Sequence, residues 1–214
     1  MKKLLGIISV IIVALFGFLA CYNNPYDNGN ANGNGNSGGG TGNPPTATSK
    51  ILIAYFSCTT TTEAIANHIE AETKGSVYKI VPEVPYTEED LKYYTGGRAD
   101  REQADPSARP AINGSVENIG KYDVIFLGYP IWHGQAPKII YSFLESYDFS
   151  GKKIIPFCTS HSSGIGSSDT DLHSLAPTAE WGTGKRFASG TSQSTISYWI
   201  ESLNIHFSPD EEEK

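Results

Sequence analysis

From Lys50 onward, the chain alternates short apolar runs with segments in which apolar residues recur at helical spacing. The apolar runs predict strands at residues 51–57, 76–82, 122–130 and 152–160, and a weaker strand at 180–189. Because several runs are apolar without interruption, both faces of these strands should be buried, as in parallel sheets covered by helices. The alternation therefore predicts an α/β fold with three layers, in which helices cover both faces of a doubly wound, parallel, five-stranded sheet.

Helical patterns lie between the predicted strands. They predict helices at residues 62–73, 136–148, 167–177 and 195–205, and an interrupted helix at 87–104. Pro137 suits the first turn of its helix, where a backbone N–H has no partner within the helix. The pattern covers about 165 residues, which fits one domain, and we place this domain at residues 50–207. The acidic residues 208–214 are expected to form a solvated tail.

The amino-terminal segment has the layout of an export signal. Two lysines precede a run of 17 residues, Leu4 to Ala20, that is apolar except for Ser9, and Cys21 follows directly. Residues 1–20 are therefore predicted to be a signal peptide. Cys21 makes the segment similar to a bacterial lipoprotein signal, in which the cysteine becomes the lipidated amino terminus. The alternative is an uncleaved membrane anchor, because roughly 17–25 apolar residues can span a bilayer.

Residues 21–49 are dominated by Asn, Gly, Ser, Thr and Pro after the cysteine. Such a segment cannot bury enough apolar surface to offset chain entropy, so we expect a flexible tether. Loss of residues 1–20 removes two lysines and no acid, which takes the formal net charge from −7 to −9. A net-acidic domain is poorly suited to nucleic acid or anionic lipid, and it suits a basic protein partner.

Three loops at the carboxyl ends of the predicted strands are candidates for ligand binding. The first is rich in hydroxyls: Ser57, Thr59, Thr60, Thr61 and Thr62. Together with the amino terminus of the following helix, they could hold a phosphate monoester without a basic residue. The first loop contains neither G-K-[ST] nor G-x-G-x-x-G. The alternative is that Thr62 only caps the helix and the other threonines are loop residues without a function.

Cys58 in the first loop raises the possibility of a phosphatase. Small tyrosine phosphatases place a cysteine nucleophile in a strand-to-helix loop, with an arginine six residues later. Here that position is Ala64, and no arginine nearby could bind phosphoryl oxygens or lower the thiol pKa. The sequence therefore argues against a phosphatase.

The second and third loops could hold a flat ring. The second contains Pro130, Ile131, Trp132, His133 and Gly134, and an exposed Trp132 would be a platform for stacking. The alternative is a tryptophan packed into the local core. The third contains Thr159, Ser160, His161, Gly164 and Gly166, whose polar and small residues could contact a ring edge. The spacing of His and Cys does not indicate a metal site, and the three loops contain no G-x-S-x-G motif that would indicate a serine hydrolase.

Taken together, the three loops resemble those of the flavodoxin family, from about Lys50 to Ile205. The segments "AYFS", "GYPIW" and "PFCTS" carry the resemblance, and "SCTTTT" takes the place of the family's Ser-x-Thr-Gly-Asn-Thr phosphate loop. Ser57, Thr59 and Thr62 match this loop, whereas Thr60 and Thr61 replace glycine and asparagine. A β-branched residue disfavours positive φ, so these two replacements argue against a tight turn at this point. The resemblance implies FMN as cofactor and the strand order 2-1-3-4-5.

The strand order has a consequence for the two remaining cysteines, Cys58 and Cys158. If the third strand lies between the first and fourth, their backbones lie roughly 9–10 Å apart, because neighbouring strands are about 4.8 Å apart. A disulfide requires about 4.4–6.8 Å between α-carbons. We therefore predict that both cysteines remain free thiols.

The resemblance implies a monomeric electron-transfer protein in which the flavin carries out the redox chemistry. Its acidic surroundings should disfavour the anionic reduced flavin and lower the potential. The export signal adds a membrane-anchored location facing the extracytoplasmic side. One alternative is an FMN-dependent NAD(P)H or quinone oxidoreductase of the same fold. Another is a binding module without flavin, for which the threonine substitutions are the only indication.

Overall fold

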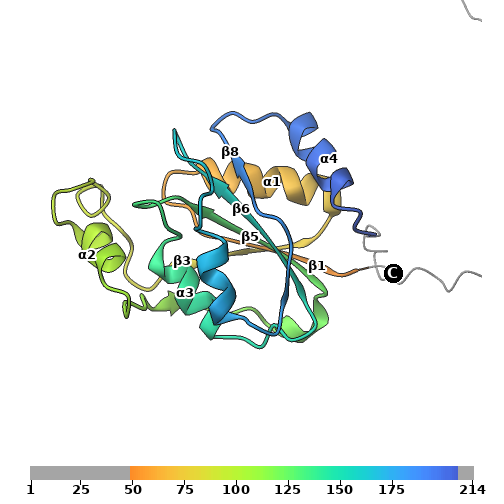
Figure 1. Cartoon of the computed structure of the whole chain (residues 1–214), viewed down its shortest axis with the longest axis horizontal. Helices are drawn as coiled ribbons and strands as arrows, with labels where there is room; N and C mark the ends of the chain where they lie inside the picture. The colour runs from red at the N-terminus through yellow and green to blue at the C-terminus, as the bar shows by residue number, and fades with distance from the viewer. Residues whose placement is uncertain (1–48, 207–214) are drawn as a thin grey trace, which may run out of the picture. The chain divides into compact units, whose positions relative to one another are not determined.

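The computed structural model describes residues 49–206, and Figure 1 shows their fold. The predicted signal peptide, Cys21, residues 21–48 of the predicted tether and the acidic tail lie outside the described residues. The elements are β1 Ile51–Tyr55, α1 Thr61–Thr73, β2 Ser76–Lys79, β3 Val81–Pro82, α2 Arg98–Ala104, β4 Ile112–Asn113, η1 Ile119–Lys121, β5 Val124–Pro130, α3 Lys138–Glu145, β6 Lys153–Thr159, η2 Thr170–Leu175, β7 Glu180–Trp181, β8 Lys185–Phe187 and α4 Gln193–Ser202. Strands and helices alternate along most of the chain, as predicted.

The central sheet has the strand order β2-β1-β5-β6-β7, and β8 also pairs with β6. All pairs in this sheet are parallel. The predicted order 2-1-3-4-5 is therefore confirmed, because β5 is the predicted third strand and β6 the fourth. The fifth position is shared by the short strands β7 and β8.

Alternation along β1 assigns its residues to the two faces of the sheet. Ile51, Ile53 and Tyr55 belong to a core that includes Ile65 and Ile69 of α1. Residues 52, 54 and 56 belong to the other core, together with side chains of α3 and η2. In Figure 1, α1 and α4 lie on one side of the sheet and α3 on the other. The three predicted layers are confirmed, and each face of the sheet has its own apolar core.

The fifth strand is divided because of a proline in its neighbour. The N–H of Gly182 donates to the carbonyl of Ile154 at 2.8 Å. In a parallel ladder, the next hydrogen bond would come from the N–H of residue 156. Pro156 has no N–H to donate, so pairing stops there and resumes at Lys185. The prediction of one strand at 180–189 is wrong in this respect.

Two other predicted elements are only partly formed. The strand predicted at 76–82 ends at Lys79, and Val81–Pro82 form β3, which pairs antiparallel with β4 in a separate two-stranded sheet. The interrupted helix predicted at 87–104 is helical only in α2, since residues 88–96 form turns. Figure 1 shows α2 beyond the end of the central sheet. The chain between β3 and β4 therefore forms an excursion rather than a covering helix.

Candidate functional site

The first loop passes from β1 into α1 through a threonine with left-handed backbone conformation. Thr60 is the N-cap of α1 and has φ 63° and ψ −10°. Its hydroxyl donates to the carbonyl of Thr59 at 2.6 Å rather than capping the helix. The chain thus makes the tight turn with a β-branched residue, in a conformation that normally favours glycine.

We expect Thr60→Gly to raise the free energy of unfolding by about 0.5–1 kcal/mol. The left-handed conformation costs a residue with a Cβ about 1–2 kcal/mol, and the greater freedom of glycine in the unfolded chain cancels part of the gain. Urea denaturation measures the change. Thr59→Gly is a matched control, because Thr59 does not have positive φ and should only lose stability. Equal effects of the two substitutions would contradict the assignment of strain to Thr60.

Thr62 connects the first loop to the third. It is buried, and its hydroxyl lies 2.8 Å from the hydroxyl of Thr159 at the end of β6. Thr62 is therefore part of the framework that holds these two loops together. The alternative that Thr62 caps α1 is wrong, since the N-cap is Thr60.

The second loop is a tight turn after β5. Trp132 and Gln135 exchange two backbone hydrogen bonds of 2.9 Å, and His133 and Gly134 between them have positive φ. The Trp132 side chain packs against Phe56 and Tyr86, with ring centroids 5.3 and 5.2 Å away, and is only 8% exposed. The expectation of an exposed tryptophan is therefore wrong, because these two rings enclose it.

The excursion around α2 holds the second loop in place. The side-chain amide of Gln103 donates to the carbonyls of Trp132 and Ala136, and its oxygen accepts from the N–H of Lys138. His133 Nε2 lies 2.7 Å from a carboxylate oxygen of Asp100. The carboxylate also accepts from two backbone N–H groups in the turn before α2. The loop and the excursion therefore form one hydrogen-bonded unit.

The third loop follows β6. The guanidinium of Arg186 on β8 donates to the carbonyls of Ser160 and His161, at 2.5 and 3.1 Å. The hydroxyl of Ser160 accepts from the N–H of Ser163 at 2.9 Å. These contacts fix the course of the backbone immediately after β6.

The three loops and the excursion surround a cavity of about 320 Å³, at the lower end of the roughly 300–1,000 Å³ typical of ligand pockets. Nine of the predicted site residues line it: Ser57, Thr59, Thr61, Pro130, Ile131, Trp132, Thr159, Ser160 and His161. Six predicted site residues do not line it: Thr60, Thr62, His133, Gly134, Gly164 and Gly166. The structure thus brings all three predicted loops to one cavity, while the glycines of the third loop lie outside its lining.

Four residues of the lining were not predicted as site residues: Cys58, Leu91, Tyr93 and Ser189. Leu91 and Tyr93 belong to the turns before α2. In the sequence, an apolar residue and two tyrosines stand out among the charged residues of this segment. Local sequence patterns do not show, however, that the segment packs against the second loop.

The side chains that line the cavity are hydroxyl-bearing or apolar, with one thiol and one imidazole. Among the described residues that form it, none is Lys, Arg, Asp or Glu. Desolvation raises the pKa of the Cys58 thiol to about 11, so the thiol is protonated at neutral pH. The groups that the lining itself offers a ligand are therefore hydroxyls, backbone N–H groups and apolar surface, while the charges of Lys79 and Arg98 act on Cys58 from outside the lining.

The second thiol, Cys158, is buried in β6, and burial raises its pKa to about 12. Both cysteines are free in the structure, and β5 lies between β1 and β6. We expect thiol titration of the denatured, unreduced protein with Cys21 replaced to find two reactive groups. A bridge between residues 58 and 158, mapped by peptide mass, would contradict this prediction.

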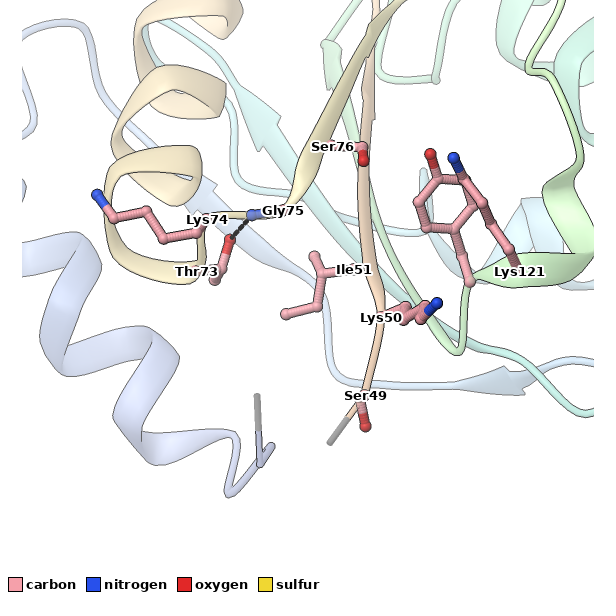
Figure 2. A pocket seen from close by; sticks show the side chains of 9 residues that line it. Ser49, Lys50, Ile51, Thr73, Lys74, Gly75, Ser76 and Lys121 are labelled. Carbon is pink, nitrogen blue, oxygen red and sulfur yellow. Dashed lines mark hydrogen bonds between the residues drawn. The ribbon is translucent and has the colours of Figure 1, made fainter. Parts of the chain in front are cut away.

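A second cavity, of about 170 Å³, lies near the opposite ends of β1 and β2. Figure 2 shows that the Lys74 side chain points away from Lys50 and Lys121, so these three lysines do not converge on one ligand. Within residues 49–206, the structure has no cluster of three or more side chains suited to a metal ion. No helix in this range is long and apolar enough to cross a membrane.

Comparison with known proteins identifies the family. The flavodoxin family model matches residues 50–203. A candidate flavoprotein from Bacteroides eggerthii is 42% identical, with a TM-score of 0.70, over 74% of this chain and 99% of that protein. For one from Bacteroides uniformis, the identity is 39% and the TM-score 0.69, over 72% and 99% of the two chains.

A flavoprotein from Lactobacillus acidophilus, solved in complex with FMN, is 20% identical, with a TM-score of 0.54, over 72% of this chain and 99% of that protein. At this identity, the likeness shows the fold alone. None of the curated proteins matches the chain. The family match covers nearly all of the described residues, and they have the strand order expected of flavodoxins. The chain belongs to the flavodoxin family.

Proposed function

We propose that this protein binds FMN without a covalent bond and transfers electrons while tethered to a membrane. One observation carries the proposal: a single cavity joins a hydroxyl-rich helix amino terminus to an apolar wall and a polar edge. These three parts correspond to the phosphate, the ring faces and the ring edge of FMN. The FMN complex of the Lactobacillus acidophilus flavoprotein, which has the same fold, also supports the proposal.

The residues of the cavity have distinct roles in this proposal. Hydroxyls of Ser57, Thr59 and Thr61, with the N–H groups at the start of α1, hold the phosphate. Pro130 and Ile131 exclude water from one side of the ring system, and polar groups at the end of β6 contact its edge. Bound FMN supplies the electron-transfer chemistry. The protein binds and orients the cofactor.

The alternative is an FMN-dependent NAD(P)H or quinone oxidoreductase of the same fold. A nicotinamide dinucleotide would bind outside the space assigned to FMN, so turnover, rather than the lining of the cavity, separates this enzyme from an electron carrier.

The test first measures the absorbance of flavin bound to the protein and then the electron-transfer activity of the reconstituted protein. Purified protein mixed with FMN and freed of excess should show the flavin bands, and their absence would exclude the cofactor. The reconstituted protein should then accept electrons from a chemical reductant and pass them to a heme protein, without steady-state oxidation of NADH or NADPH by a quinone. Rapid steady-state turnover would identify an oxidoreductase instead.

A basic protein is the partner that fits this chain. Without residues 1–20, the formal net charge is −9, so a surface of positive charge would be attracted over a range of about 10 Å at 0.1 M ionic strength. The rate of electron transfer to a basic heme protein should therefore fall as salt is raised. The partner would exchange electrons with a monomeric carrier on the extracytoplasmic side.

We expect Cys21 to carry lipid and Cys21→Ser to release the protein from membranes or block its processing. The reason is the apolar run that ends at this cysteine, before a segment rich in Asn and Gly. Mass spectrometry of the membrane-extracted protein measures the amino-terminal peptide. Recovery of an intact segment from Met1 to Ala20 would instead indicate the uncleaved anchor.

A further inference from the structure

Two aromatic side chains border the cavity, and they differ in the surface that a ligand can reach. Trp132 is 8% exposed, because Phe56 and Tyr86 pack against it. Tyr93 is 49% exposed and lines the same cavity. A flat ring gains stacking energy only on aromatic surface that it can cover. Tyr93 therefore offers the larger free aromatic area.

Tyr93 is held in place although its ring is open. Its hydroxyl donates to the carbonyl of Ile131 at 3.1 Å, and its ring centroid lies 4.7 Å from that of His133. Desolvation raises the pKa of the Tyr93 phenol, so the hydroxyl stays protonated and able to donate. His133 is itself held by Asp100. A platform fixed in this way loses little side-chain entropy when a ring stacks on it.

We propose that Tyr93, placed by the turns before α2, is the residue on which the flavin ring stacks, whereas Trp132 supports the loop beneath. The inference rests on the proposed FMN site and names its ring-binding residue. The contacts of Gln103 and Asp100 with the second loop hold the turns that carry Tyr93 against the cavity. The excursion between β3 and β4 then has a function: it completes the flavin site.

The test is a fluorescence titration of the full-length apo protein with FMN, which gives both Kd and the fluorescence of bound flavin. Tyr93→Leu should raise Kd about tenfold, equivalent to about 1.4 kcal/mol and within the range for stacking on one aromatic ring. It should also increase the fluorescence of bound flavin, because an adjacent phenol quenches it. Tyr93→Phe keeps the ring and should remain within about threefold of wild type, since only one hydrogen bond is lost.

Tyr198→Leu is the matched control, because Tyr198 is 72% exposed on α4 and does not line the cavity. It should bind FMN as wild type does. If Tyr93→Leu does not fold, Tyr93→Trp tests the stacking role instead. This variant should bind FMN at least as tightly as wild type and quench the fluorescence of bound flavin more completely.

Three results would overturn the inference: wild-type affinity in Tyr93→Leu, an equal loss in Tyr93→Phe, or weaker binding by Tyr93→Trp. If wild type itself binds no FMN, the proposed function fails and the inference fails with it. If wild type binds and Tyr93→Leu binds equally well, only the inference fails.

Discussion

Addition of FMN at 100 times its Kd is expected to raise the midpoint of thermal unfolding by about 5–11 °C. A ligand that binds only the folded state stabilises it by about 2.7 kcal/mol at this excess. For a domain of this size, 1 kcal/mol corresponds to roughly 2–4 °C. Differential scanning fluorimetry over a range of FMN concentrations measures the shift. The shift should grow steadily with concentration, because it arises from mass action.

Riboflavin is the control for the phosphate. It has the ring but not the phosphate, so it should give a smaller shift at the same concentration. Thr61→Val removes a hydroxyl from the lining while keeping the shape of the side chain. This variant should reduce the shift with FMN and leave the shift with riboflavin unchanged. The absence of any shift at FMN concentrations far above micromolar would refute the cofactor assignment.

Gly128→Ala is expected to destabilise the fold by about 2–3 kcal/mol, at the upper end of the usual range for overpacking. A Cβ at Gly128 on β5 would lie 2.2–2.8 Å from three ring atoms of Phe157 on β6. Phe157 is fully buried, so its ring has no solvent-filled space into which it could turn. Urea denaturation of the apo protein measures the loss.

Two comparisons make this prediction specific. Gly164→Ala is the matched control, because a Cβ there meets no atom closer than 4.0 Å and its φ is not positive. It should change stability little. In a double-mutant cycle, Gly128→Ala should cost less in a Phe157→Leu background than in wild type, because the smaller side chain makes room. Additive losses would show that the ring is not the cause.

The three layers of this fold could be predicted because a strand that is buried on both faces has a continuous run of apolar residues. The run from Ile51 to Phe56 is apolar at every position, and the structure sends alternate residues to two different cores. Prediction of the strand order depended on the resemblance to flavodoxins, since apolar periodicity does not show which strands are neighbours in the sheet. The interruption of the fifth strand after Gly182 could not be predicted from the local sequence, because it depends on Pro156 in the adjacent strand.

The positions of the three loops followed in the same way from the direction of the strands. Parallel strands bring their carboxyl ends to one edge, so the hydroxyls after β1 and the polar residues after β6 had to lie near each other. The hydrogen bond between Thr62 and Thr159 is a direct result of this arrangement. The backbone conformation of Thr60 could not be predicted in this way, because the turn imposes a left-handed conformation that a β-branched residue disfavours.

By itself, the sequence determined the α/β class, the two-sided burial of the sheet and the hydroxyl-rich loop at the start of α1. These features depend on residues close together in the chain, where periodicity and turn chemistry act. The tertiary structure alone decided that Trp132 is enclosed by Phe56 and Tyr86 and that Tyr93 lines the cavity. The physical reason is that exposure of a side chain depends on which distant segments pack over it, and local patterns carry no information about such packing.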